Sequence, residues 1–324
     1  MAGTSRLFRL EEHDYPRLHD LLSPFLPESI TILGWFEQHR DAPPVPPIWA
    51  SFSVAEPAPP LLALFVLGTE IAGYQSRLFC SAEASPGQPT PEQETFVASF
   101  VEASLRAAFE YIAETSRTGA FTRESGLIIG SIHEKWHDCL RALPYAGSHS
   151  PCRKVVLPPS AARAFAEGAS DARLPPGARV TQLRNGDLET VMSYNKIART
   201  TAYVKSRMEQ SVCIRAPGPD GEEVPVAWTV VHADSSIGQL HVIEAFQRRG
   251  LGSELVRRIV GLRLAKAEEW IVDHPDEPKD MTNGWNVVDV VEGNQEGAGF
   301  YGRLEGWEQA WLCSWTMFTA PPSI

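Results

Sequence analysis

The sequence has few cysteines, no long apolar run and no excess of basic residues. Its five cysteines are scattered over 324 residues, and an odd, widely spaced set argues against a disulfide framework or a structural zinc site. No stretch approaches the roughly 20 apolar residues that a membrane span needs. The 29 basic and 40 acidic residues give a net charge of −11, which disfavours nucleic acid as a partner.

The first residues also lack the apolar core of a signal peptide, because Met1–Arg6 is soon followed by Glu11, Glu12 and Asp14. We therefore expect a cytoplasmic protein without a membrane partner. Apolar residues make up 43% of the chain, enough to build globular cores, and the length suggests two domains. The oligomeric state is left open by the sequence.

A segment rich in Pro, Ala and Ser divides the chain, and we interpret residues 158–177 as a linker. Residues 178–324 then form a domain with the order β-α-α-β-β-β-α-β-α-β. Its most distinct features are a hairpin of strands 224–232 and 237–242, and an amphipathic helix that begins after a glycine-containing turn. Asp187 is expected to cap the first helix of this domain.

Residues 1–157 form the N-terminal α/β domain in a weaker series of elements. We expect strands at 30–35, 48–54, 61–67, 126–132 and 153–157, with helices at 92–114 and 134–143. This order is similar to that of the later part of the second domain, but no second glycine-rich loop is seen. Two interpretations stay open, a diverged tandem copy that does not hold the ligand and an unrelated α+β domain.

The turn between residues 240 and 253 carries the strongest chemical signal. A strand containing Leu240, His241 and Val242 runs into the sequence Gln247-Arg248-Arg249-Gly250-Leu251-Gly252-Ser253, which opens a helix. Glycines allow backbone N–H groups to approach a pyrophosphate, and the helix N-terminus adds its positive dipole end. Four further basic residues follow on the helix, and such a cluster in an acidic protein fits a polyanionic ligand: Arg257, Arg258, Arg263 and Lys266. A ligand-free strand-to-helix turn is the alternative.

This turn resembles the Q/R-x-x-G-x-G/A loop of the GNAT acyltransferase superfamily. The later segment from Asn294 through Tyr301 to Gly306-Trp307 resembles the superfamily's N-x6-Y…G-F pattern, with one extra residue before Gly306 and Trp for Phe. The resemblance implies the mixed-sheet α/β GNAT fold, with acetyl-CoA or another acyl-CoA as cosubstrate and no metal. It implies CoA contacts from residues 240–242, the whole 247–253 turn and Asn294, and a thiolate proton donor in Tyr301. Asn294 could instead only cap its helix, and Tyr301 could be a packed aromatic.

A closer resemblance is to the glycine N-acyltransferase-like family. It rests on Tyr203-Val204-Lys205, Ser211–Arg215, Pro225–Trp228 and Ile237–Leu240, with a weaker match at Leu22–Gly34. The resemblance implies transfer of an acetyl or larger acyl group to the amine of a small molecule or amino acid such as glycine, by direct attack on the thioester. In that family the backbone N–H at the position of Val242 is the oxyanion donor.

The general base is where the sequence departs from this family, because Ser236 stands at the position of the family's glutamate. Serine alone does not deprotonate an ammonium. We rank Asp234, two residues away, above His241 as a replacement, and a water chain is a third route. The predicted catalytic residues are therefore Tyr301, Asp234 and Ser236. A CoA-binding or regulatory module that has lost its chemistry is the alternative function.

One other motif, His133-Glu134-Lys135-Trp136-His137, fits the H-E-x-x-H zincin pattern. On a helix it would place two imidazoles on one face. No third ligand stands at a family-typical position, and Trp136, Cys139, Leu140 and Leu143 form an apolar packing face. A zinc metallohydrolase through His133 and His137 is therefore a remote alternative. Trp228 and Trp285 are interpreted as core residues, or else as an aromatic wall for the acyl or acceptor group.

Overall fold

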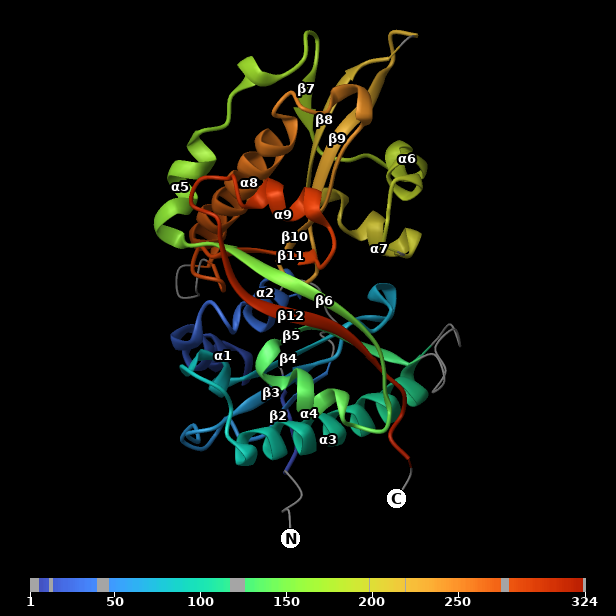
Figure 1. The fold of residues 1–324 in the computed structure, drawn as a ribbon. Helices are drawn as coiled ribbons and strands as arrows, with labels where there is room; N and C mark the ends of the chain where they lie inside the picture. Colours follow the sequence, from blue (N-terminus) through green and yellow to red (C-terminus); the bar gives the residue numbers. More distant parts are fainter. Residues whose placement is uncertain are drawn as a thin grey trace. The chain divides into compact units, whose positions relative to one another are not determined.

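The computed structural model describes residues 6–11, 14–39, 47–116, 126–197, 199–218, 220–274 and 280–322, and these form two compact units (Figure 1). Unit 1 comprises residues 1–154, 289–295 and 309–324, and unit 2 comprises residues 155–288 and 296–308. The units differ from the two sequence-based domains, because two C-terminal segments belong to unit 1. No helix in the described part of the chain is long and apolar enough to cross a membrane.

Unit 1 is built on an eight-stranded sheet in the order β1-β2-β3-β4-β5-β12-β6-β11. The strands are β1 (Phe8–Arg9), β2 (Ile48–Ala50), β3 (Ala63–Val66), β4 (Ser76–Cys80), β5 (Leu127–His133), β6 (Ala146–Leu157), β11 (Asn286–Val291) and β12 (Glu308–Phe318), and the helices are α1 (Tyr15–Leu22), α2 (Ile30–His39), α3 (Pro91–Thr115) and α4 (His137–Arg141). Strands β1 to β4 pair antiparallel in sequence order, and β4 pairs parallel with β5 after the chain passes through α3. The C-terminal strand β12 pairs antiparallel with β5, and this pairing explains why the end of the chain belongs to unit 1.

The predicted strand at residues 30–35 is wrong, because these residues form helix α2. Seven consecutive residues from Ile30 to Phe36 are buried. A run that is apolar on every side shows neither the twofold period of a half-buried strand nor the 3.6-residue period of an amphipathic helix. The pattern therefore could not distinguish a buried strand from a buried helix.

Unit 2 contains a four-stranded antiparallel sheet in the order β10-β9-β8-β7. The strands are β7 (Arg179–Thr181), β8 (Ser211–Pro217), β9 (Glu223–Val231) and β10 (Ile237–Val242), and the helices are α5 (Pro159–Glu167), α6 (Leu188–Ser193), α7 (Thr201–Ser206), α8 (Leu251–Asp273) and α9 (Gln295–Tyr301). The predicted hairpin of β9 and β10 and the helix after the glycine turn are confirmed. The segment interpreted as a linker contains α5, which packs against α8.

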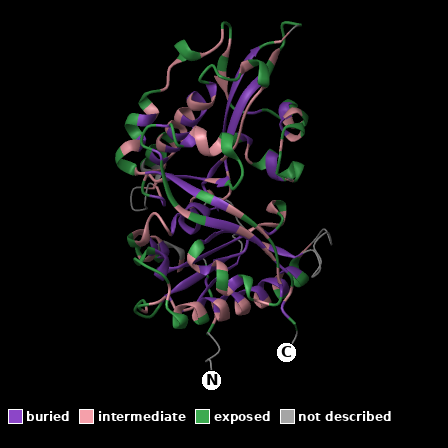
Figure 2. Ribbon diagram, in the orientation of Figure 1, coloured by how far each residue is buried: buried purple, intermediate pink, exposed green. Residues whose placement is uncertain are grey.

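Helices cover the two faces of this sheet, and most of β8 and β9 is buried between them (Figure 2). Helix α8 contacts β8, β9 and β10, whereas α6 and α7 lie on the other side of these strands (Figure 1). On that second side, Cys213, Trp228 and Val230 pack with Val191 and Val204 of the two short helices. Residues of β9 and β10 therefore face either α8 or the pair α6 and α7.

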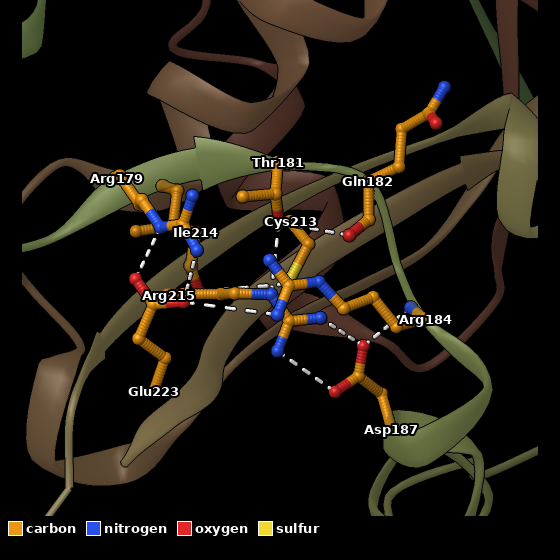
Figure 3. A network of polar contacts seen from close by, with 9 residues as sticks. All are labelled: Arg179, Thr181, Gln182, Arg184, Asp187, Cys213, Ile214, Arg215 and Glu223. Carbon is orange, nitrogen blue, oxygen red and sulfur yellow. Dashed lines mark hydrogen bonds and ion pairs between the residues drawn. The ribbon is translucent and has the colours of Figure 1, made fainter. Parts of the chain in front are cut away.

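A buried ion pair fixes the start of α6 (Figure 3). Arg215 of β8 is 2% exposed and forms a bidentate contact with Asp187, in which its Nη1 is 3.0 Å from Oδ1. Its Nε donates to Thr181 of β7, and the backbone N–H of Arg184 donates to Asp187 at 2.6 Å. Asp187 was expected to cap the helix, but its carboxylate instead ties the helix start to β7 and β8.

Candidate functional site

The connection from β10 to α8 ends in an open helix N-terminus. A short 3-10 turn, Glu244–Phe246, follows β10, and Gly250 occupies the N-cap position with a left-handed backbone, φ +81°. The first N–H groups of any α-helix have no partner inside the helix, and Gly250 has no side chain to satisfy them. A Cβ placed on Gly250 would meet nothing within 4 Å. This helix end therefore offers backbone donors and a positive dipole end to an anion.

The side chains of the turn add positive charge to this helix end. Arg248 and Arg249 are exposed, and no carboxylate in the described part of the chain forms an ion pair with either. Arg249 lies over the ring of Phe246, 5.5 Å from its centroid. Gln247 turns back to the strand, where its Nε2 donates to the backbone oxygen of Val242 at 2.9 Å. The turn is thus held by Gln247, while two guanidinium groups stay available for a ligand.

The basic residues further along α8, which were expected to suit a polyanionic ligand, have structural partners within the chain. Arg257 lies over the ring of Phe165 at 4.9 Å, and Arg258 pairs with Glu254 at 2.7 Å. Arg263 is buried and donates to oxygens of Thr282, Trp285 and Asn286. The Nζ of Lys266 lies 3.5 Å from a backbone oxygen. Some of these partners lie one helical turn away on α8, and others lie outside α8, so sequence spacing does not show them. Among the described residues, the charge that remains unpaired and exposed at the turn is that of its two arginines.

Tyr301 lies at the end of α9 and is 6% exposed. Its ring packs against Phe300 and Trp307, with centroids 5.0 and 5.3 Å away. Phe300 in turn covers Gly252, where an added Cβ would lie 3.1 Å from the ring, so this contact ties the end of α9 to the first turn of α8. Burial raises the pKa of the Tyr301 phenol, and the group is therefore neutral and able to donate a proton at physiological pH.

Asp234 and Ser236 are brought together in the turn of the β9–β10 hairpin. Asp234 is 1% exposed, and its Oδ1 accepts from the backbone N–H of Ser236 at 3.1 Å and from its hydroxyl at 2.6 Å. Asp234 also raises the pKa of Tyr203, although burial is the larger cause. Burial lowers the pKa of Arg207, and the negative charge of Asp234 opposes that shift. These contacts, both to Oδ1, give Asp234 a part in closing the turn.

Sequence reasoning missed the polar partner of this hairpin. The Tyr203 hydroxyl of α7 is 2.8 Å from Nδ1 of His232 at the end of β9, and the two rings stack at 5.9 Å. The pair is 29 positions apart in the chain, and no local pattern indicated it. Only the approach of α7 to the hairpin, a tertiary contact, brings the two side chains together.

The other predicted ligand residues have distinct environments. His241 and Val242 pair with Trp228 and Ala227 across the hairpin, and the register shifts between Gly238 and His241. Leu240 lies within this irregular stretch of β10. Ser253 lies in the first turn of α8. Asn294 belongs to unit 1, where its backbone N–H donates to Val291 at 3.1 Å. Unit 2 thus brings together the glycine turn, the hairpin and Tyr301.

The H-E-x-x-H residues do not share a helix. His133 is the last residue of β5 and accepts the backbone N–H of Lys135 at 3.2 Å, whereas His137 is the first residue of α4. Their rings pack against Trp311 and His149, respectively. Burial, followed by the charge of Lys135, lowers the pKa of His133 to about 3. The described residues contain no group of three His, Cys, Asp or Glu side chains that could hold a metal.

Comparisons with known proteins identify the fold. No protein-family model and no curated protein sequence matches the chain. A Drosophila protein of solved structure is 16% identical over 96% of this chain and 98% of its own, with a TM-score of 0.64. A tandem GNAT protein from the clavulanic acid biosynthesis pathway is 15% identical over 98% and 100%, and a GCN5-related N-acetyltransferase from Sphaerobacter thermophilus is 13% identical over 99% and 98%, both with TM-scores of 0.50. At these identities the similarity concerns the fold alone, and it confirms the predicted class: the chain has the mixed α/β fold of the GNAT acetyltransferases, along the whole length of a tandem GNAT protein.

Proposed function

We propose that the protein is an N-acyltransferase that uses acyl-CoA, and that the turn from Gln247 to Gly252 holds the CoA pyrophosphate. The observation that carries this proposal is the helix start at Gly250, with its left-handed backbone, uncapped N–H groups and two exposed arginines. Its place after β10 matches the place where the GNAT sequence signature puts the CoA loop.

Different residues of unit 2 are proposed to carry the separate steps of the reaction. Bound acyl-CoA supplies the activated thioester. The turn fixes its phosphates, and the backbone N–H of Val242 is the proposed oxyanion donor, as the family resemblance implies. Tyr301 is the proposed acid, because its buried phenol keeps its proton and the departing thiolate of CoA needs one. The acceptor amine must be neutral when it attacks, and its nitrogen forms the new C–N bond as the C–S bond breaks.

The acceptor is proposed to be a small primary amine or an amino acid such as glycine, and the acyl group an acetyl or larger chain. This assignment rests on the segments that resemble the glycine N-acyltransferase-like family, above all Pro225–Trp228 and Ile237–Leu240. We propose neither a nucleic-acid nor a membrane partner and no metal. Asp234 and Ser236 are assigned to shaping the hairpin next to β10.

A second candidate function is CoA binding without catalysis. It is favoured by Ser236 at the position of the family's base, with its hydroxyl engaged by Asp234. The two functions predict the same affinity for CoA and differ in turnover.

The test is a panel of acyl-CoAs and amines in which released thiol is measured, beside calorimetry with CoA alone. Thiol release that requires both substrates supports the acyltransferase. CoA binding without release for any pair would select the binding module. A protein that does not bind CoA at all would refute both.

A further inference from the structure

Three aromatic rings meet on the side of the unit 2 sheet that faces α6 and α7. The ring of His241 on β10 lies 4.5 Å from Tyr194 and 4.9 Å from Trp228, and Tyr194 lies 5.8 Å from Trp228. Trp228 is buried in the core of β9, whereas Tyr194, just after α6, is 44% exposed. The cluster therefore connects the sheet interior to the surface, and His241 lies between its two ends.

Polar atoms in this region lack partners. Nε2 of His241 is buried and forms no hydrogen bond among the described residues, and the same holds for Nδ2 of Asn195 and both amide atoms of Gln239. Buried polar groups are nearly always hydrogen-bonded, and each exception calls for an explanation. In the chain, Asn195 adjoins Tyr194, and Gln239 lies two residues before His241. A polar molecule bound beside the three rings is one explanation of these unpartnered atoms.

The backbone of β10 supports a functional interpretation. The register against β9 shifts between Gly238 and His241, and Gln239 has a positive φ of 50°. A bulge redirects side chains, and a non-glycine residue in the left-handed region is strained. Such strain is concentrated at functional sites, and here it lies two residues before His241.

The other titratable groups of the hairpin are engaged. Asp234 accepts two hydrogen bonds from Ser236, and His232 is bonded to Tyr203. His241 has no such partner. Within the described hairpin, Nε2 of His241 is therefore a buried basic nitrogen whose hydrogen-bonding capacity is unused.

We propose that His241 is the general base of the acyl transfer, with Nε2 taking a proton from the acceptor ammonium, and that Tyr194, Asn195 and Gln239 position that acceptor. The inference rests on the proposed function and adds a residue to it. The ammonium gives one proton to Nε2, and its nitrogen then forms the C–N bond while the C–S bond breaks. The nitrogen loses a second proton, which restores the Tyr301 phenol after that group has protonated the thiolate. The imidazolium releases its proton to solvent, so the reaction yields one free proton in total.

The electrostatic surroundings suit this role. Burial lowers the pKa of His241 below its ordinary value of 6.5, and the positive charge of Lys196 adds to the shift. Two titratable groups near the His241 ring, Tyr194 and Lys196, come from the segment after α6. The neighbouring ring on β9 is that of Trp228, which does not titrate. The imidazole is thus neutral, and able to accept a proton, throughout the neutral pH range.

The test is the pH dependence of kcat/KM for the wild type and for His241→Gln, measured with the amine and acyl-CoA that give the highest turnover. The kcat/KM of the wild type should rise with pH below pH 6.5 and reach a constant value by pH 7. In His241→Gln, kcat/KM should be about 10²-fold lower at pH 7. The pH range over which it rises should move towards the pKa of the acceptor amine, so that the kcat/KM values of the two proteins converge at high pH. His232→Gln is the matched control in the same hairpin, and its kcat/KM should rise over the same pH range as that of the wild type.

A second variant separates chemistry from structure. His241→Ala should bind CoA as the wild type does and should regain activity when imidazole is added, because free imidazole can occupy the vacated space and take the proton. If the wild type is active and His241→Gln has the same pH profile of kcat/KM, the assignment of His241 is overturned. The same holds if the rise of kcat/KM with pH moves in Asp234→Asn and not in His241→Gln. Wild type that binds CoA but never turns over would overturn the proposed function, and the base with it.

Discussion

Helices α3 and α8 each follow a strand, β4 in unit 1 and β10 in unit 2, but their N-termini differ in chemistry. At α3 the Thr90 side chain accepts from the backbone N–H of Gln93, and the Gln93 side chain accepts from the backbone N–H of Thr90. Pro91 begins the helix, and Glu92 and Glu94 follow. At α8 a glycine precedes the helix, and the preceding side chains are two exposed arginines.

The difference concerns how each helix start satisfies its free N–H groups. A capping box satisfies the free N–H groups internally, and acidic residues in the first turn repel phosphate. The start of α3 is therefore closed to an anion. The first turn of α8 also holds an acid, Glu254, but this side chain is buried and paired with Arg173 and Arg258, so it does not close that helix start in the same way. Each connection before the helix contains an acid, but Glu83 before α3 is buried, whereas Glu244 before α8 is exposed.

The largest effect is expected at the proposed acid. Tyr301→Phe keeps the ring between Phe300 and Trp307 and removes the donor, so kcat should fall about 10²-fold with little change in CoA affinity. Tyr145→Phe is the matched control, because it removes a buried phenol from unit 1. Steady-state kinetics that showed equal losses for both variants would assign the effect of Tyr301 to packing.

A smaller effect is expected at the helix starts themselves. Gly250→Val places a β-branched residue at φ +81° and fills the space left open for a ligand, so the Kd for CoA should rise at least about tenfold, ~1.4 kcal/mol. Gly87 precedes α3 with a similar φ of +84° and equally open surroundings. Gly87→Val should strain the backbone to the same degree and leave the Kd unchanged. Calorimetry that found the same Kd in both variants would move the pyrophosphate away from this turn.

The charge of the turn can be tested separately. Arg248→Ala should weaken CoA binding about fivefold, ~1 kcal/mol, as expected for an exposed charge contact, and should reduce the dependence of the Kd on salt. Arg163→Ala removes the same charge from an exposed arginine that pairs with Glu268 in the later part of α8. If titrations at low and high salt gave both variants the same Kd, the two arginines of the turn would not contact the phosphates.

The fold of unit 2 was largely predictable because its elements carry clear local signals. The hairpin consists of two strand-forming runs on either side of a polar turn, and Gly250 marks the start of α8, so both were confirmed within a residue or two. Unit 1 was harder, since a helix that is buried on all sides, such as α2, loses the periodicity that identifies helices.

The site was predictable only where its chemistry is local. The glycine turn and Tyr301 follow from motifs, and the structure joins them through Phe300 and Gly252. The pairing of Asp234 with Ser236 and the three rings around His241 depend on turn geometry and on contacts across 13 to 47 positions of the chain. No sequence period records such contacts, and Asp234 therefore ranked above His241 as the base when the sequence was considered alone.

The smallest effect on CoA affinity is expected at Glu83, which tests whether the connection before α3 serves stability. Its Oε1 accepts from the backbone N–H of Cys80 at 2.9 Å and from the indole N–H of Trp136 at 2.8 Å, and burial raises its pKa to about 8. The folded-state pKa thus lies above the unfolded value of 4.5, so the folded protein binds more protons between these pH values. The stability contributed by the protonated group is complete below pH 4.5 and is lost as the pH rises through about 8.

Glu83→Gln keeps an oxygen acceptor for both N–H groups and cannot ionise. Between pH 5 and pH 9 its free energy of unfolding should fall less than that of the wild type. The difference between the two falls should be about 1–3 kcal/mol, the range for a buried polar group that loses its hydrogen-bond partner. Urea titrations at the two pH values measure this difference, and CoA affinity should be the same in both proteins. A parallel pH dependence of the two free energies would show that Glu83 is ionised in the folded state, and the acid before α3 would then be an anion held by its hydrogen bonds.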